Sequence, residues 1–346
     1  MKNLFISSVL FFATLMMWLV GSTGASAQSI TLSPNASSTI TINQNGVTII
    51  SDGEIISLPS DESLTEVFNE DGNIIINGRR IGSADNFSSR KVTGSKEYTT
   101  RKVELGKNFN YIKASRGVQV VMSDKKGNSA TIEANSNIID YVICESNGGT
   151  LKVGIDDEIG NISNMHVVVT IPHRDNINVY QVSSAATITI HPTLSTSNVS
   201  LEATSAGQIH LTRINCDKLL VKASSAASIT GSFRFKTQAL LEASSAASVE
   251  VSLLGENASL KASSAAKIKA QGQVNILDAD ASSAADIKAQ ELNSVKAEAE
   301  ASSGATIYVN CSNKLEAEAS SGGDVRYTGN CQVERSTSSG GSVKKL

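Results

Sequence analysis

Leu241-Glu242-Ala243-Ser244-Ser245-Ala246-Ala247-Ser248-Val249 is the clearest copy of a phrase that returns nine times between Tyr180 and the C-terminus. The second Ser of each copy follows that of the previous copy by 18 to 21 residues. A short, nearly fixed period is typical of a solenoid, in which each repeat contacts only its neighbours. The nine Ser residues are Ser184, Ser205, Ser225, Ser245, Ser264, Ser283, Ser303, Ser321 and Ser339.

Apolar and polar residues alternate within each copy. In the quoted copy, Leu241, Ala243 and Val249 lie on one side of a chain whose period is two, and Glu242 lies on the other. The pattern therefore predicts strands with a buried side and a water-facing side. The water-facing positions equivalent to Glu242 form one column, in which the charges partly alternate in sign: Gln181, Glu202, Lys222, Glu242, Lys261, Asp280, Glu300 and Glu318.

A coil of about 20 residues cannot bury its own apolar side, but coils stacked about 4.8 Å apart place like residues on like. We therefore expect an all-β protein built on a β-solenoid. It is a single-stranded parallel β-helix of about nine coils of 18 to 21 residues, preceded by a β-rich segment. A right-handed coil is expected because parallel crossover connections favour that hand.

The second Ser of each copy has the same parity as the buried Ala and Ile or Val positions. The parity predicts an inward column formed by the nine Ser residues named above, inside a tight corner where stacked hydroxyls satisfy one another. We interpret Ser-Ser-Ala-Ala as a packing corner and not as a nucleophile, because nine copies without a partnered base form no catalytic site.

The N-terminal residues indicate export. Residues 1–27 carry one positive charge at Lys2, an apolar run from Leu10 to Val20 and a small-residue ending at Ala25-Ser26-Ala27. These are the three parts of a secretory signal peptide. We expect a mature chain from Gln28 that has no membrane span and is periplasmic, displayed on the outer surface or secreted.

The mature chain divides by sequence pattern. Residues 28–97 form a short β-rich segment and linker, with alternating runs in Ser38–Ile50 and Asn73–Gly78. Residues 98–346 form the solenoid domain, with the repeats in about 180–346. The formal net charge of the whole chain is −3 and no basic cluster occurs, which argues against nucleic acid as a partner.

Four cysteines occur in a chain that we expect to be exported, where disulfides can form. Cys311 and Cys331 each follow an Asn and lie one coil apart, so stacking would bring them within the distance of a disulfide. Buried free thiols are the equally supported alternative. Cys144 and Cys216 have no such partner, and no pair has the spacing of metal ligands.

Candidate catalytic and metal-binding groups are few. The four His residues are scattered, and Asp156-Asp157-Glu158 lacks the spaced loop of a dedicated Ca²⁺ site. Asp278, Asp280 and Asp286 fall in one coil and invite comparison with β-helical polysaccharide lyases and hydrolases, but all three have outward parity. We therefore expect no enzyme activity, no metal and no cofactor.

The order of motifs before the repeats resembles one known family. The series contains Phe109-Asn-Tyr-Ile-Lys-Ala-Ser-Arg-Gly-Val-Gln-Val, Asn135-Ser-Asn, Gly149-Thr-Leu-Lys-Val and Val167-Val-Val-Thr-Ile-Pro, followed by the Ser-Ser-Ala-Ala coils. From Tyr98 to Leu346 the chain resembles the bacterial head GIN domain family, which is classed with adhesins. The resemblance implies an exported, surface-associated β-helical domain and carries over no catalytic or ligand residues.

Two classes of function remain open at this point. The first is a non-catalytic adhesin or cell-envelope structural protein whose repetitive surface binds an external glycan or protein. The second is a carbohydrate-active enzyme on a β-helix, which would need paired carboxylates and aromatic platforms for sugar rings. Aromatic residues make up only 4% of the chain, which favours the first class. A role in envelope signalling is a third reading, and the sequence leaves the oligomeric state open.

Overall fold

The computed structural model describes residues 28–31, 38–43, 46–51, 54–59, 73–76, 79–83, 90–106, 108–156 and 159–346. The predicted signal segment at residues 1–27 lies outside these ranges. The chain divides into two compact units, Met1–Arg90 and Lys91–Leu346. No helix among the described residues has the length and apolarity needed to cross a membrane.

The described strands of the first unit are antiparallel. Strands β1 (Gln28–Thr31), β2 (Ser38–Asn43), β3 (Gly46–Ser51) and β4 (Glu54–Pro59) pair in chain order. Strands β5 (Asn73–Ile76) and β6 (Arg79–Ser83) form a separate pair. The alternating runs that the sequence analysis placed in this segment are therefore strands.

The second unit begins with short strands in mixed directions. Strand β8 pairs antiparallel with β11, β11 with β15, and β12 with β13, while β7 pairs with β14. A single turn of 3-10 helix covers Ile139–Tyr141. The strands are β7 (Arg90–Thr93), β8 (Tyr98–Glu104), β9 (Tyr111–Ala114), β10 (Gln119–Met122), β11 (Ser129–Asn135), β12 (Val142–Asn147), β13 (Thr150–Ile155), β14 (Ile159–Ser163) and β15 (Val167–Ile171).

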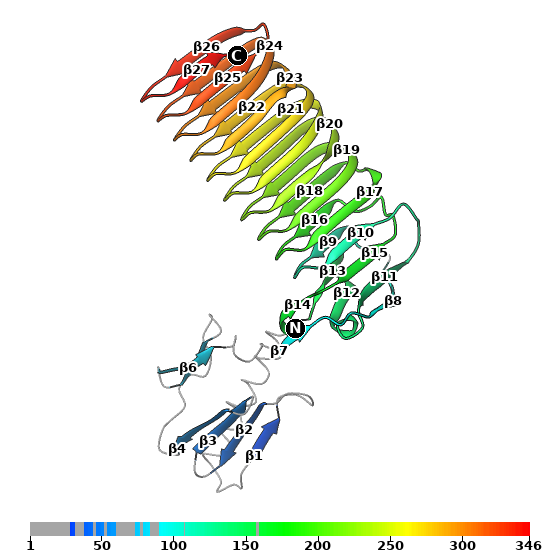
Figure 1. The fold of residues 1–346 in the computed structure, drawn as a ribbon. Coiled ribbons are helices and arrows are strands. Elements are labelled where there is room, and N and C mark those ends of the chain that lie inside the picture. Colours follow the sequence, from blue (N-terminus) through cyan, green and yellow to red (C-terminus); the bar gives the residue numbers. More distant parts are fainter. Residues whose placement is uncertain are drawn as a thin grey trace. The chain divides into compact units, whose positions relative to one another are not determined.

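From β16 onward the strands are parallel and stacked in register, which confirms the β-solenoid (Figure 1). Strands β19 to β24 each run for 14 to 16 residues from one Ser turn to the next. The strands are β16 (Val179–Val182), β17 (Thr187–Ser195), β18 (Asn198–Ala203), β19 (Gln208–Ala223), β20 (Ser228–Ala243), β21 (Ser248–Ala262), β22 (Lys267–Ala281), β23 (Asp286–Ala301), β24 (Thr306–Ala319), β25 (Asp324–Thr328), β26 (Gln332–Thr337) and β27 (Ser342–Lys345).

The repeated Ser-Ser-Ala-Ala phrase forms a tight turn. In the copy at Ser263–Ala266, Ser264 and Ala265 both have positive φ, at 53° and 59°. Two successive residues with positive φ are the pattern of a type I′ turn, which reverses the chain. The amide of Ala266 donates to the carbonyl of Ser263 at 3.1 Å and closes the turn.

The turns also bond to one another along the stack. The amide of Ala265 donates to the carbonyl of Ser283 in the next turn at 3.0 Å, and the amide of Ala246 donates to the carbonyl of Ser264 at 3.0 Å. The hydrogen-bond ladder of the parallel strands therefore continues through the bend. Backbone groups that a sharp corner would otherwise leave unpaired are satisfied.

The expected inward column of Ser hydroxyls is wrong. All nine residues, Ser184, Ser205, Ser225, Ser245, Ser264, Ser283, Ser303, Ser321 and Ser339, are exposed and have positive φ. The alternation of a strand does hold on both sides of the turn, since Ala243 and Ala247 are buried around Ser245. It fails at the Ser itself because this residue stands at the tip of the turn, beyond the two strands.

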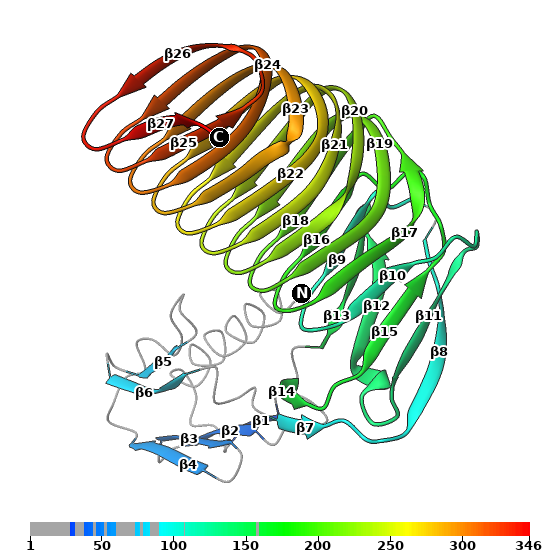
Figure 2. The ribbon, with the colours of Figure 1, turned by 45° about the horizontal axis from the view of Figure 1, so that its top comes forward.

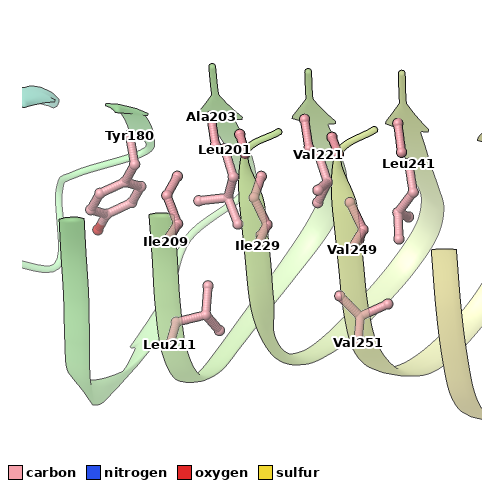
Figure 3. Close-up of a cluster of buried hydrophobic side chains, with 14 of the residues drawn as sticks. Tyr180, Leu201, Ala203, Ile209, Leu211, Val221, Ile229, Leu241, Val249 and Val251 are labelled. Atoms are coloured by element: carbon pink, nitrogen blue, oxygen red, sulfur yellow. The ribbon is translucent and has the colours of Figure 1, made fainter. Parts of the chain in front are cut away.

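The reversal at each turn folds a coil into two segments that lie back to back (Figure 2). Their inward side chains meet and form the core. Leu201, Val221 and Leu241 form one row from the segments before the turns, and Ile209, Ile229 and Val249 form the facing row (Figure 3). All six side chains are fully buried.

The structure adds a coil that the repeat count missed. Strands β9 and β10 stack in parallel register on β16 and β17, with Tyr111 opposite Val179 and Gln119 opposite Thr187. They are joined at Arg116 and Gly117, which have the φ values of a Ser turn, 64° and 70°. Residues between β10 and β16 interrupt the period here, so spacing alone could not reveal this coil.

Replacing Leu241 by Ala is expected to lower the free energy of unfolding by about 2–5 kcal/mol, through lost burial and a residual cavity. Leu241 is fully buried and lies between Val221 and Leu260 in the adjacent coils. Glu242→Gln is the matched control, because its side chain faces water and its surface ion pair with Lys222 contributes little. Urea unfolding that gave equal shifts for both variants would contradict the assignment of inside and outside.

The positive φ of the exposed residue Ala265 predicts how substitutions there affect stability. Ala265→Val is expected to lower the free energy of unfolding by about 1–2 kcal/mol, because a branched side chain is poorly tolerated at positive φ. Ala265→Gly is expected to cause no loss, since Gly304 occupies the equivalent position in the coil of Ser303. Thermal unfolding of both variants tests this, and a neutral Val variant would contradict the strained turn.

Candidate functional site

The outward side of the segments that lead into the Ser turns is the candidate binding surface. We call it the pre-turn face. Its central column is the one that the sequence analysis predicted to face water, and the residues are stacked in register from Gln181 to Glu318. None of the eight side chains is buried, which confirms their outward direction.

Charges in the first half of this column are paired between coils. The Gln181 amide donates to the Glu202 carboxylate at 3.1 Å, and Lys222 forms an ion pair with Glu242 at 2.9 Å. Opposite charges on neighbouring strands stabilise a sheet, although exposed pairs contribute little each. The partial alternation of sign seen in the sequence therefore appears as contacts between coils.

A groove of about 380 Å³ runs beside this column, where the strands enter the turns. Its walls include Glu202, Lys222, Glu242, Lys261 and Asp280. Small residues line the rest, namely Ala203, Ala223, Ala243 and Ala262 with the hydroxyl residues Thr204, Ser224, Ser244, Ser263 and Ser282. The groove thus offers a regular series of hydroxyls and alternating charges across several coils. We call it the charged groove.

A second groove of about 340 Å³ lies on the same face, toward the beginning of the segments. It is lined by Val179, Leu220 and Leu240, which are half-buried, and by polar residues that include Asn178 and Lys218. The side-chain oxygen of Asn178 is buried and has no hydrogen-bond partner among the described residues. A buried acceptor without a donor is costly, so a bound molecule that donates to it would gain affinity. We call this the apolar groove.

The period and parity of the repeats do not by themselves predict the apolar groove. Leu220 and Leu240 follow one another in register and have outward parity, where most coils carry polar residues. That break in the alternation is the signal that could have identified them. The neighbouring residues Leu201, Val221 and Leu241 have inward parity and belong to the core.

The His residues do not converge on one site. His166 bonds to Glu133 at 3.0 Å, His173 to Asp175 at 2.6 Å and His210 to Thr230 at 2.8 Å, each on a different strand or loop. Among the described residues no group of three His, Cys, Asp or Glu side chains has the arrangement of a metal site. Asp157 and Glu158 of the weighed Ca²⁺ site lie outside the described residues.

The three Asp residues of one coil are divided by the turn. Asp278 and Asp280 lie on the pre-turn face, while Asp286 follows Ser283 and lies on the opposite side of the coil. The Ser259 hydroxyl donates to Asp278 at 2.9 Å. The structure therefore does not bring these carboxylates together around one substrate position.

Cys311 and Cys331 lie in contact, as the stacking of coils predicted. The structure describes both as free thiols: Cys311 is buried, and Cys331 is half-buried with its thiol hydrogen-bonded to that of Cys311. Burial raises the pKa of Cys331, and the neighbouring thiol raises it further. Burial also raises the pKa of Cys144 and Cys216 to about 11, which makes those thiols poor nucleophiles. A disulfide between Cys311 and Cys331 stays a prediction.

The fold and the open grooves define the class of protein: a parallel β-solenoid with a repetitive outer face. Residues 108–254 and 232–331 match the family model described as "Putative auto-transporter adhesin, head GIN domain". These overlapping matches cover more than half of the sequence. The chain belongs to the head GIN domain family, as the order of its motifs predicted.

Solved structures share the fold at low sequence identity. A putative adhesin from Parabacteroides distasonis ATCC 8503 has a TM-score of 0.56 and 17% identity, over 74% of this chain and 100% of that chain. A putative adhesin from Parabacteroides merdae ATCC 43184 has a TM-score of 0.55 and 16% identity, over 74% and 99%. A putative lipid binding protein from Parabacteroides distasonis ATCC 8503 has a TM-score of 0.54 and 16% identity, over 74% and 100%. No curated protein matches this sequence.

We predict that Cys311 and Cys331 form a disulfide when the protein meets an external disulfide or thiol oxidase. The half-buried Cys331 would attack first, Cys311 would displace the external thiol, and the oxidant would take up the two electrons. A bridge that closes a loop of about 20 residues adds about 3 kcal/mol in the chain-entropy model. Peptide mapping without reductant is expected to recover the two peptides joined. Cys311 linked to Cys144, or both thiols free after oxidation, would contradict the pairing.

Proposed function

We propose that the protein is exported and acts without catalysis, by binding an external partner along its pre-turn face in adhesion or envelope structure. Membership of the head GIN domain family supports the adhesive role. The signal-peptide pattern of residues 1–27 supports export. An extended face of stacked coils suits many weak contacts along a partner, whose effects combine when they act together.

The observation that carries the proposal is the apolar groove. Half-buried Leu220 and Leu240 offer carbon surface, and the Asn178 side-chain oxygen offers a buried acceptor beside them. Binding sites combine apolar lining with a few polar groups that fix orientation. The charged groove on the same face adds hydroxyls and charges over several further coils. A glycan or an extended protein segment has the matching donors and carbon faces.

A carbohydrate-active enzyme is the second class of function. Its active site would need two carboxylates facing one glycosidic bond, about 5–9.5 Å apart. Asp278 and Asp280 do share the pre-turn face, which makes them the pair to test. Asp286 lies on the opposite side of the coil and cannot complete that pair.

Binding to arrays of glycans and extracellular matrix proteins tests the proposal. The double variant Leu220→Ser with Leu240→Ser is expected to weaken the identified interaction about tenfold or more, since a buried Leu contributes roughly 1.5–3 kcal/mol. Leu254→Ser is the control, because Leu254 is an outward-facing Leu, 41% exposed, that lies outside both grooves. An equal loss in the control, or no binding to any array member, would contradict the assignment.

Incubation with a panel of polysaccharides separates the two classes of function. We expect no new reducing ends or unsaturated products from the purified protein. Turnover that disappears in Asp278→Asn or Asp280→Asn would overturn the non-catalytic role in favour of the enzyme. Because both substitutions are on the exposed face, they are not expected to alter folding.

A further inference from the structure

The C-terminal part of the pre-turn face is acidic. Beyond Lys261 the alternation of charge ends, and Asp280, Glu300 and Glu318 stack in register in successive coils. Asp278, Glu298 and Glu316 form a second stack beside them. Like charges on adjacent strands destabilise a sheet, so the isolated protein carries repulsion here.

Little inside the chain neutralises these carboxylates. Lys314 forms ion pairs with Glu316 at 2.6 Å and with Glu334 at 3.1 Å, on the flank of the stack. Among the described residues Glu298, Glu300 and Glu318 form no ion pair. Burial raises the pKa of Glu300, and the neighbouring Glu298, Glu318, Asp280 and Asp278 raise it further. The repulsion between stacked carboxylates therefore acts on Glu300, at the centre of this surface.

The opposite side of the same coils is basic. We call the outward side of the segments that leave the Ser turns the post-turn face. Lys269, Lys288, Arg326 and Lys344 stand in one of its columns, with Tyr308 between Lys288 and Arg326. Lys267 precedes them in the adjacent column. Two of these cations form ion pairs within the face: Lys269 with Glu250 at 2.8 Å, and Arg326 with Asp324 at 2.7 Å.

The net charges of the two faces are opposite. Over β22 to β26 the pre-turn face carries seven carboxylates and the two lysines Lys296 and Lys314, a net charge of −5. Over β22 to β27 the post-turn face carries five cations and the three acids Asp286, Glu291 and Asp324, a net charge of +2. Because the two segments of a coil lie back to back, these faces point in opposite directions (Figure 2).

We propose that the acidic pre-turn face of β22 to β26 binds the basic post-turn face of a second copy of this chain. Both faces repeat at the coil spacing of about 4.8 Å, so alignment of one pair of coils aligns the others. Charge complementarity would steer the encounter and fix the register. A face of one copy meets a different face of the next, which makes the interface heterologous and the assembly an open row.

The size of the surface indicates weak association. Four to five coils span roughly 20–24 Å and each strand segment has a length of about 15–20 Å, which gives roughly 600–960 Å² buried in total on the two copies. This lies below the range of stable protein pairs, so copies are expected to associate only when concentrated. The apolar groove lies on earlier coils and stays open in such a row, whereas the charged groove ends at Asp280 and Ser282, at the edge of the proposed interface.

Sedimentation velocity over a range of protein concentrations tests the association. At about 0.02 M NaCl the mean mass is expected to rise with concentration to twice the monomer mass or more. At about 0.5 M NaCl screening of the surface charges is expected to return the monomer. A mass that stays monomeric at low salt, or an association that high salt strengthens, would overturn the proposal.

Charge-reversal variants test whether the pre-turn and post-turn faces are the two surfaces that associate. The triple variant Glu298→Lys, Glu300→Lys, Glu318→Lys and the triple variant Lys267→Glu, Lys288→Glu, Lys344→Glu are each expected to stay monomeric at low salt. Mixing the two variants is expected to restore association, because each then meets a face of opposite charge. This rescue would not occur if either variant were misfolded, and circular dichroism checks both.

A control variant carries the same three Glu→Lys changes on strands outside the two faces. Reversal of Glu104, Glu133 and Glu145 to Lys changes the net charge equally but lies on β8, β11 and β12. This variant is expected to associate as the unmodified protein does. Loss of association in the control would show that total charge and not the two faces controls the behaviour. Failure of the mixed triple variants to associate would contradict the pairing of the two faces.

Discussion

The left-handed turn is the feature on which the solenoid depends. Two successive residues with positive φ reverse the chain within four residues, so the inward side chains before and after the turn face one another. Exposed Ser264 and Ala265 supply no side chain to the core; their contribution is the backbone conformation and the amide that bonds to the next turn. Repetition makes this strained conformation sustainable, because every turn within the stack is hydrogen-bonded to a neighbouring turn on either side.

The turn also explains which residues pack next to it. Ala243 and Ala247 flank Ser245 and are buried, whereas the larger Leu241 and Val249 lie one inward position farther away. The two segments are close at the turn and separate as they leave it, so only small side chains fit beside the tip. The increase in side-chain size from Ala to Leu follows the widening of the coil, and it fixes where along each repeat the turn must form.

Much of this architecture could be predicted from the sequence because alternation and period act over many residues at once. The outward column from Gln181 to Glu318 and the burial of Leu241 follow from parity alone. Parity failed at Ser245, where positive φ takes the residue out of the strand. The repeat period did not reveal the turn at Arg116 and Gly117, because the residues between β10 and β16 separate this coil from the others in the sequence. The apolar groove also escaped, because Leu220 and Leu240 become a surface only when stacking brings them together.

In-register stacking multiplies the effect of each outward residue. The register that stacks Glu300 on Asp280 also stacks Glu318 on Glu300. An outward column therefore keeps one sign of charge unless a coil carries the opposite charge at that position. The early coils reverse the sign, as Lys222 with Glu242 shows, and gain cross-strand pairs. The late coils carry mainly acidic residues on the pre-turn face and mainly basic residues on the post-turn face, and they accept repulsion that alternation would remove. Because stacked like charges do not stabilise the folded monomer, this separation of charge is the feature that supports the proposed contact with a second copy of the chain.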